Sequence, residues 1–263
     1  MTLNPTTTPA SSSNPDPRST AESPHYGRVL LKVSGEAFCK PDGFGIDGRE
    51  LEVIGREIAQ AAKLGTQLAV VVGGGNIIRG AVLAQQGHIP QATADYMGML
   101  GTVINGLALK EMLESIGQPA RLLSAINLSA VAESFIRGRA IRHLEKGRVV
   151  IFAAGTGNPF FTTDTAAALR ATEIGAEALL KATKVDGIYD KDPMMHNDAT
   201  RFESLSFQEA IDRQLKVMDL AAYSMCMERN IPIVVFNMKT PGHIAEVVSG
   251  QPHGTRVVGL DQD

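Results

Sequence analysis

From Gly27 onward, short runs of apolar residues alternate with segments of helical periodicity. The most distinct apolar runs are Val29–Val33, Leu68–Val72, Val149–Ala153, Ala178–Leu180 and Ile231–Phe236. These runs are compact and rich in β-branched residues, a pattern typical of strands that are covered on both faces in a mostly parallel sheet. The sequence therefore predicts a buried central sheet.

Between the apolar runs, apolar residues recur every three or four positions, as in amphipathic helices. One helix is predicted to begin at a cap on Asp47 and to end at Gly65. The stripe that it buries consists of Leu51, Ile54, Ile58 and Ala61. Farther along the chain, Ser206 and Glu209 have the spacing of a capping box, which predicts the start of another helix.

A further helix is marked by Met97, Leu100, Ile104 and Leu107 and is predicted to stop before Gly117 and Pro119. It also contains Gly98, Gly101 and Gly106. Each glycine inside a helix lowers its stability by roughly 0.5–1 kcal/mol relative to alanine, so the presence of three glycines needs an explanation. Close contact with another helix, including one across a subunit interface, and close approach of a substrate are both open explanations.

Strands alternating with helices over about 230 residues predict an α/β fold, specifically a three-layer αβα sandwich around a mostly parallel sheet. No repeat and no linker divides this region, so residues 27–263 are expected to form a single domain. Residues 1–26 contain five prolines and ten Ser or Thr, a composition typical of a disordered tail. This tail has neither the apolar stretch of a secretory signal nor the Arg-rich, acid-poor composition of a transit peptide.

Composition excludes several classes of function. At 44% apolar and 20% charged residues the chain can bury a full core. Its formal net charge of −3 argues against a general nucleic-acid-binding protein. No apolar run approaches the ~18 residues that a membrane-spanning helix needs. We therefore expect no nucleic-acid partner and no membrane insertion, and any anion site must be built from locally placed cations and backbone N–H groups.

The cysteines and histidines carry little sign of metal chemistry. Cys39 and Cys226 lack metal or redox spacing and are expected to be reduced thiols in the cytoplasm. The six histidines are scattered, without paired ligand spacing such as H-E-x-x-H. A dedicated protein metal site is therefore not expected.

Glycines follow three of the predicted strands directly. The three segments are Ser34-Gly35, Gly73-Gly74-Gly75 and Gly155-Thr156-Gly157. Ligands of open parallel sheets bind beyond the carboxyl ends of the strands, and successive backbone N–H groups there form a cradle for anions. One glycine turn is usually no more than a turn, but three at corresponding strand ends predict an anion site.

Three familiar phosphate-binding classes are excluded. The chain has no G-x-x-x-x-G-K-[ST] segment, so it is not a P-loop enzyme. The dinucleotide-binding fingerprint fails because Gly73-Gly74-Gly75 is followed by Asn76-Ile77-Ile78. A protein-kinase catalytic loop is also absent from the sequence.

Two cations stand beside these glycines. Lys32 lies in an apolar run just before Ser34-Gly35. It is interpreted as a group that neutralises phosphoryl oxygens, against the alternative of a lysine that protects an edge strand from aggregation. Arg79 follows the triple glycine, where a guanidinium can bind two phosphate oxygens. Its alternative is a solvated arginine in the first turn of a helix, a position that the helix dipole disfavours.

These residues belong to longer motifs that resemble those of the bacterial UMP kinases, a family of the amino-acid kinase fold. The motifs are Lys32-Val33-Ser34-Gly35-Glu36, Gly73–Gly80, Asp95-Tyr96-Met97-Gly98-Met99, Gly155–Asp164 and Lys181–Gly187. The resemblance extends without interruption from about Gly27 to Arg256, and the motif at 155–164 is long and specific. It implies synthesis of UDP and ADP from UMP and ATP, with Mg²⁺ carried by ATP.

The resemblance also implies roles for individual residues. Contacts to ATP are implied for Lys32, Ser34, Gly35, Gly75, Arg79, Thr183, Tyr189 and Asp192, the last three forming the adenosine pocket. Contacts to UMP are implied for Gly74, Asp95, Thr156, Gly157, Asn158, Pro159, Phe160, Phe161, Thr162 and Thr163. Lys32, Arg79 and Asp164 are the expected catalytic residues. For Asp164 two roles stay open, a helix N-cap and a carboxylate that orients the phosphate-binding lysine.

The same resemblance implies a homohexamer that is activated by GTP and inhibited by UTP, with residues 40–45 as the expected GTP-responsive loop. Two alternatives remain at this stage. One is another kinase of the same fold with a different acceptor, such as an acyl phosphate or an isoprenoid phosphate. The other is a non-catalytic relative that binds nucleotides or oxyanions.

Overall fold

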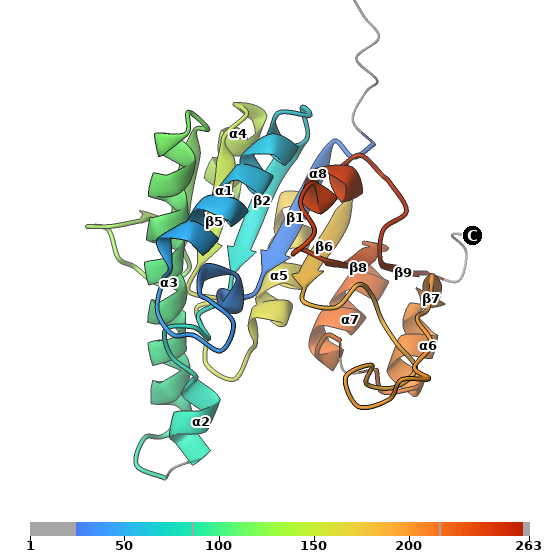
Figure 1. Ribbon diagram of the computed structural model, residues 1–263. Helices are drawn as coiled ribbons and strands as arrows, with labels where there is room; N and C mark the ends of the chain where they lie inside the picture. The colour runs from blue at the N-terminus through green and yellow to red at the C-terminus, as the bar shows by residue number, and fades with distance from the viewer. Residues whose placement is uncertain (1–24, 86, 216, 260–263) are drawn as a thin grey trace, which may run out of the picture.

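Figure 1 shows a computed structural model of the chain, which describes residues 25–85, 87–215 and 217–259. Residues 1–24 of the predicted tail therefore lie outside the described part. Tyr26, near the boundary drawn from composition, is buried, and its carbonyl oxygen accepts a hydrogen bond from Thr66 Oγ1 at 2.9 Å. The packed part of the chain thus begins before Gly27.

The centre of the molecule is a nine-stranded sheet with the strand order β4-β3-β5-β2-β1-β6-β8-β9-β7. The strands are β1 (Arg28–Val33), β2 (Gln67–Val72), β3 (Ala120–Ser124), β4 (Glu133–Ser134), β5 (Val149–Ala153), β6 (Ala178–Thr183), β7 (Ser204–Ser206), β8 (Ile233–Asn237) and β9 (Thr255–Val258). All neighbouring pairs are parallel except β8 with β9. The mostly parallel sheet predicted from the apolar runs is confirmed.

Alternating burial assigns the two faces of the sheet. Along β1, Val29, Leu31 and Val33 belong to one buried cluster, whereas Leu30 belongs to another. This alternation follows from the two-residue period of a strand. Both faces are apolar, so each must be covered by helices, as the three-layer prediction requires.

Helices of two groups cover the two faces (Figure 1). The helices that supply residues to the first cluster are α1 (Gly48–Ala62), α3 (Gln91–Ser115) and α8 (His243–Val248). Those that supply the second are α4 (Arg137–Glu145), α5 (Thr163–Ile174), α6 (Phe207–Asp212) and α7 (Leu220–Glu228). The remaining helical segments are a short 3-10 turn, η1 (Gly35–Phe38), and α2 (Gly80–Gln85). The chain is a three-layer αβα sandwich.

The predicted helix ends are found close to their expected positions. Asp47 caps α1, because its carboxylate accepts hydrogen bonds from the N–H groups of Arg49 and Glu50 at 2.9 and 3.3 Å. Ser206 caps α6 by accepting from Glu209 N–H at 3.0 Å. The carboxylate of Glu209 pairs with Arg213 at 2.9 Å. The prediction that Ser206 begins this helix as its cap is confirmed.

Helix α3 spans the region expected from its apolar residues, but a different face of it is buried. Leu100 and Ile104 are 45% and 46% exposed, whereas Val103, Leu109 and Leu113 are buried against the sheet. The glycines have separate reasons. A Cβ on Gly106 would lie 2.6 Å from Leu122 Cδ1 of β3, and one on Gly101 would lie 3.2 Å from the carbonyl oxygen of Gly74. Close packing against the sheet and against the triple-glycine loop explains these two positions.

Candidate functional site

The carboxyl ends of β1, β2 and β5 open into one cleft with a volume of about 440 Å³, which we call the strand-end cleft. Helix α3 and the start of α5 complete its wall. Of the residues predicted for the site, it is lined by Lys32, Ser34, Gly35, Gly74, Gly75, Arg79, Asp95, Thr156, Phe161, Thr162 and Thr163. The structure thus brings three separate glycine segments, two cations and a carboxylate together.

The other predicted residues lie outside the lining of this cleft. Gly157, Asn158, Pro159 and Phe160 continue the turn after Thr156, and Asp164 lies behind Lys32. Thr183 is the last residue of β6, and Tyr189 and Asp192 lie in the segment that follows it. There, Tyr189 donates a hydrogen bond to Asp186 at 2.6 Å, and Asp192 accepts one from Met194 N–H at 2.8 Å. Both act in loop structure here, and the adenosine pocket stays a prediction.

Lys32 lies on β1, in the interior of the sheet between β2 and β6. The alternative of an edge-strand lysine is therefore wrong. In the parallel register of β1 and β6, Lys32 is opposite Lys181. Strand alternation places both side chains on the face that α5 covers, since Leu30 and Leu179 belong to the same cluster as the apolar residues of α5.

Asp164 of α5 lies between these two lysines. Its Oδ1 is 3.1 Å from Lys32 Nζ, and its Oδ2 is 2.7 Å from Lys181 Nζ. Burial raises the pKa of the Asp164 carboxyl, but the two ammonium groups outweigh burial, and the pKa is held below its ordinary value. Like charges directly opposite each other on neighbouring strands repel, so the carboxylate is what allows the two lysines to share this place.

The two roles left open for Asp164 are now separated. Helix α5 is capped by Thr162, whose hydroxyl oxygen accepts hydrogen bonds from the N–H groups of Asp164 and Thr165 at 3.0 and 3.3 Å. Asp164 is thus in the first turn and is not the cap. Its carboxylate contacts Lys32 instead, which is the geometry of a residue that orients the lysine.

Lys181 is the first residue of the motif Lys181–Gly187, but no role for it could be predicted from the sequence. It is 8% exposed and also donates a hydrogen bond to the carbonyl oxygen of Val217. Burial lowers the pKa of the Lys181 ammonium group more than the Asp164 carboxylate raises it. One feature of the sequence could have identified Lys181. It directly follows the apolar residues Ala178–Leu180, just as Lys32 follows the apolar residues at the start of Val29–Val33.

Arg79 precedes α2 rather than lying within its first turn. Its guanidinium is exposed and forms an ion pair with Glu36 Oε1 at 3.1 Å. The other oxygen of Glu36 binds Lys184 Nζ at 2.6 Å, and this hydrogen bond is the largest of the contributions that lower the pKa of Glu36. Because the pair is exposed to solvent, the guanidinium can exchange the carboxylate for phosphate oxygens at little cost.

Asp95 of α3 connects the helix to the turn after β5. One of its carboxylate oxygens accepts a hydrogen bond from Gln91 Nε2 at 2.7 Å, and the other accepts one from Phe160 N–H at 2.8 Å. Phe160 has a backbone φ of +71°, a value that residues other than glycine rarely adopt. Phe160 and Phe161 are 73% and 53% exposed, so neither belongs to the core.

Two polar residues of α3, which the sequence did not single out, hold the glycine loops. Thr102 Oγ1 accepts a hydrogen bond from Ala154 N–H at 2.7 Å. Asn105 Nδ2 donates to the carbonyl oxygen of Gly73 at 2.7 Å. Both side chains are buried, and buried polar groups in an apolar helix face are a signal that could have identified them.

With this geometry established, the chain was compared with known proteins. Residues 27–237 match the model of the amino acid kinase family. The chain is 53% identical over 234 residues to a uridylate kinase of Xanthomonas oryzae pv. oryzae, with 89% of this chain and 97% of that protein covered. It is also 53% identical over 234 residues to a chloroplastic uridylate kinase of Arabidopsis thaliana, of which 69% is covered.

Solved structures show the same relationship. The UMP kinase from Bacillus anthracis superposes with a TM-score of 0.86 at 38% identity, covering 89% of this chain and 97% of that one. The UMP kinase from Ureaplasma parvum superposes with a TM-score of 0.82 at 36% identity, covering 88% and 98%. The αβα sandwich of this chain is thus similar to the structures of two proteins described as UMP kinases.

Proposed function

This chain belongs to the amino acid kinase family, and we propose that it uses the strand-end cleft to transfer the γ-phosphate of ATP to UMP. The products are UDP and ADP, so the enzyme is a nucleoside-monophosphate kinase of pyrimidine nucleotide synthesis. The observation that carries the proposal is that Lys32 and Arg79 line the same cleft as Asp95 and Thr156. Cations for the transferred phosphate and groups for the acceptor nucleotide are therefore adjacent.

The ATP phosphates are assigned to the side of the cleft formed by Lys32, Ser34, Gly35, Gly75 and Arg79. The close packing of the backbone around the glycines on this side supports the assignment. A Cβ on Gly35 would lie 2.8 Å from Gly75 N, so the two loops can approach each other this closely only because Gly35 lacks a side chain. Backbone N–H groups and two cations form the kind of anion site that phosphates bind.

UMP is assigned to the opposite side of the cleft. Asp95 is suited to accept hydrogen bonds from ribose hydroxyls, while the segment Thr156–Thr163 surrounds the base. The exposure of Phe160 and Phe161 supports this assignment, because two aromatic rings beside an anion site offer flat surfaces for a base.

The chemical step needs no side chain to act as a general base. An oxygen of the UMP phosphate is already ionised and attacks the γ-phosphorus in line, and the bond from that phosphorus to the bridging oxygen of ADP breaks. Lys32 and Arg79 compensate the charge that moves to the bridging oxygen and spreads over the equatorial oxygens. Asp164 positions the ammonium group of Lys32, and the two substrates are aligned by binding.

Mg²⁺ is proposed to arrive bound to ATP. The carboxylates near the ATP side are already engaged, Asp164 by two lysines and Glu36 by Arg79 and Lys184. These residues therefore fit a metal that is held mainly by phosphate oxygens and water. When bound, the metal supplies charge neutralisation at the β- and γ-phosphates.

A homohexamer with GTP activation and UTP inhibition is part of the proposal. Assembly of several subunits is supported by three large apolar side chains that α3 exposes, Tyr96, Leu100 and Ile104. An exposed patch of this kind is typical of protein–protein contact. A cytoplasmic location is also proposed, in keeping with Cys39 and Cys226 as buried thiols. No helix in residues 25–85, 87–215 or 217–259 has the length and hydropathy to cross a membrane.

The experiment that tests the function measures ADP release from ATP with UMP, CMP, dUMP or carbamate as acceptor, with and without GTP. We expect the highest kcat/KM with UMP and an increase in rate with GTP. A preferred acceptor other than UMP would assign the chain to another kinase of the same fold. Binding of UMP without ADP release would identify a non-catalytic nucleotide-binding protein.

A further inference from the structure

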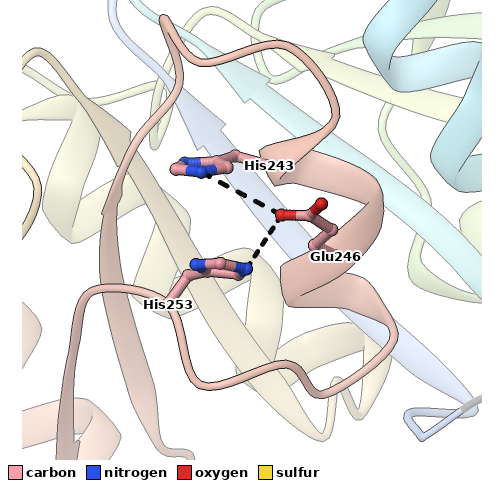
Figure 2. Close-up of side chains that lie close together, drawn as sticks. All are labelled: His243, Glu246 and His253. Atoms are coloured by element: carbon pink, nitrogen blue, oxygen red, sulfur yellow. Dashed lines mark ion pairs between the residues drawn. The ribbon is translucent and has the colours of Figure 1, made fainter.

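Two histidines and a glutamate meet on the surface of the molecule, away from the residues that line the strand-end cleft (Figure 2). His243 and Glu246 lie on α8, and His253 lies in the segment between α8 and β9. Figure 2 shows both imidazole rings directed toward the carboxylate of Glu246. One ligand atom from each residue lies within 4.8 Å of the other two.

The tautomer of His243 is fixed by a backbone contact. Its Nδ1 lies 3.1 Å from the carbonyl oxygen of Asn237, at the end of β8. A carbonyl oxygen accepts hydrogen bonds and cannot donate, so Nδ1 carries the hydrogen and Nε2 of the neutral ring carries a lone pair. The same outer contact, from a ring N–H to a backbone carbonyl, orients histidines that bind metals.

Two of the three separations in this group lie on either side of the value expected around a metal ion. His253 Nε2 is 2.8 Å from Glu246 Oε2, and His243 Nε2 is 4.0 Å from the same oxygen. With metal–ligand bonds of about 2.0–2.2 Å, tetrahedral ligands lie about 3.4 Å apart, midway between these two values. The imidazole nitrogens lie within 4.8 Å of each other, so a bound metal would also draw the two histidines closer together.

An ordinary ion pair explains this arrangement less completely. A protonated His253 would account for its own contact with Glu246, but it would leave His243 Nε2 at 4.0 Å, beyond hydrogen-bond distance. The two rings are also stacked, with centroids 4.6 Å apart, so they would repel each other if both were cationic. A metal ion would use both lone pairs and the carboxylate at once, with the stacked rings turning so that their in-plane lone pairs converge on it.

We propose that His243, Glu246 and His253 bind a divalent transition-metal ion, with Zn²⁺ the best match and water as the fourth ligand. Two imidazoles and one carboxylate are ligands that Zn²⁺ prefers. The exposure of the side chains, 22% for His243, 47% for Glu246 and 34% for His253, leaves access for the ion and the water. This proposal departs from the expectation, drawn from the scattered histidines, that no dedicated metal site exists.

The consequence of such a site is a link between α8 and the start of β9. His253 lies two residues before Thr255, the first residue of β9. Helix α8 is held at its N-terminus by Glu57 of α1, whose two carboxylate oxygens accept from Gly242 N–H at 2.9 and 3.0 Å. A bound metal would fasten the last strand of the described chain to a helix that is itself fastened to α1.

The test is calorimetric titration of the full chain with ZnCl₂, after treatment with EDTA and removal of the chelator. No nucleotide is present, so the result does not depend on the proposed kinase function. We expect one equivalent of Zn²⁺ to bind the wild type, and we expect His243→Gln and His253→Gln to bind it at least tenfold more weakly. One equivalent of Zn²⁺ should also raise the Tm of the wild type but not that of either variant.

A matched control is His143→Gln. His143 Nε2 lies 3.3 Å from Glu133 Oε2, a similar histidine–glutamate pair, but in the described residues no other group of three potential ligands was found. This variant should bind Zn²⁺ like the wild type. A cooperative thermal unfolding transition without added Zn²⁺ verifies that each variant is folded. Absence of stoichiometric binding to the wild type, or equal binding by His243→Gln and His253→Gln, would overturn the proposal.

Discussion

Lys32, Asp164 and Lys181 form a charge arrangement that depends on all three residues. Two ammonium groups on adjacent strands carry a net positive charge that one carboxylate reduces but does not cancel. The group as a whole is therefore cationic, and it reaches the cleft where phosphates are expected through Lys32, which lines that cleft. Because Asp164 contacts both lysines, substitution of Asp164 and substitution of Lys32 lead to two distinct predictions.

Asp164→Asn should lower both turnover and stability. Loss of the carboxylate leaves two nearly buried lysines uncompensated, and breaking a buried pair in this way typically costs about 3–5 kcal/mol. Because the folded-state pKa of Asp164 is held below 3.8, its contribution is present above that pH and is lost as the pH falls through the folded-state value. Urea unfolding from pH 7 to pH 2 measures it.

The difference in unfolding free energy between wild type and Asp164→Asn should thus be largest near neutral pH and shrink in acid. Thr163→Ser, at the neighbouring position, serves as the control because it changes no charge. A difference that stays constant across this pH range would show that the carboxylate is not stabilised by the two lysines.

Asp95→Asn should raise KM for UMP at least tenfold and change KM for ATP by less than twofold. The physical reason is that Asp95 lies on the side of the cleft assigned to UMP and also holds Phe160 N–H at 2.8 Å. Steady-state kinetics with each substrate varied in turn measure both constants. Gln91→Ala removes only the second partner of this carboxylate and should have a smaller effect; equal changes in both KM values for Asp95→Asn would contradict the assignment.

Helix α3 and the triple-glycine loop act as a unit at the scale of secondary-structure elements. The loop follows β2 and reaches the helix so closely that a Cβ on Gly74 would lie 2.7 Å from Gly98 O and 2.9 Å from Thr102 N. Thr102 and Asn105 of the same helix hold the backbone after β5 and β2. The helix therefore fixes the relative positions of two strand ends that line the cleft.

Gly74→Ala should lower Tm and UMP-dependent turnover together, because the methyl group meets backbone atoms that cannot move separately. Gly98→Ala provides the contrast, since a Cβ there meets nothing within 4 Å. Replacing this helical glycine is expected to stabilise the protein by about 0.5–1 kcal/mol. Thermal unfolding of the two variants measures this, and a Gly74→Ala protein as stable as the wild type would contradict the close packing.

Much of the fold could be predicted at this scale because strands that are buried on both faces leave continuous apolar runs. The predicted run Ala178–Leu180 nevertheless ended too early, since β6 continues through Lys181 to Thr183. A charged residue ends an apolar pattern even where the strand continues. Similarly, the apolar stripe containing Leu100 and Ile104 identified α3 but not its buried face, because small and polar residues interrupt the large apolar side chains on that face.

Over the whole molecule, sequence predicts which segments meet but not the contacts between them. Glycines after strands converge because parallel strands end at one edge, so the cleft could be predicted. The role of Lys181 could not, since it depends on the register of β6 against β1 and on α5 lying over both. The His243–Glu246–His253 group was missed for the same reason, as its third member comes from the loop beyond α8.

The central claim is that a cleft at one edge of the sheet transfers phosphate by charge compensation. Its most direct test is the kcat of Lys32→Ala for UMP-dependent ADP formation, with exposed Lys146→Ala as the control. Removing a contact that stabilises the transition state typically costs about 10²–10³ in turnover, and Asp164 keeps Lys181 as a partner, so the variant should remain folded. A Lys32→Ala enzyme with near-normal kcat would contradict the account.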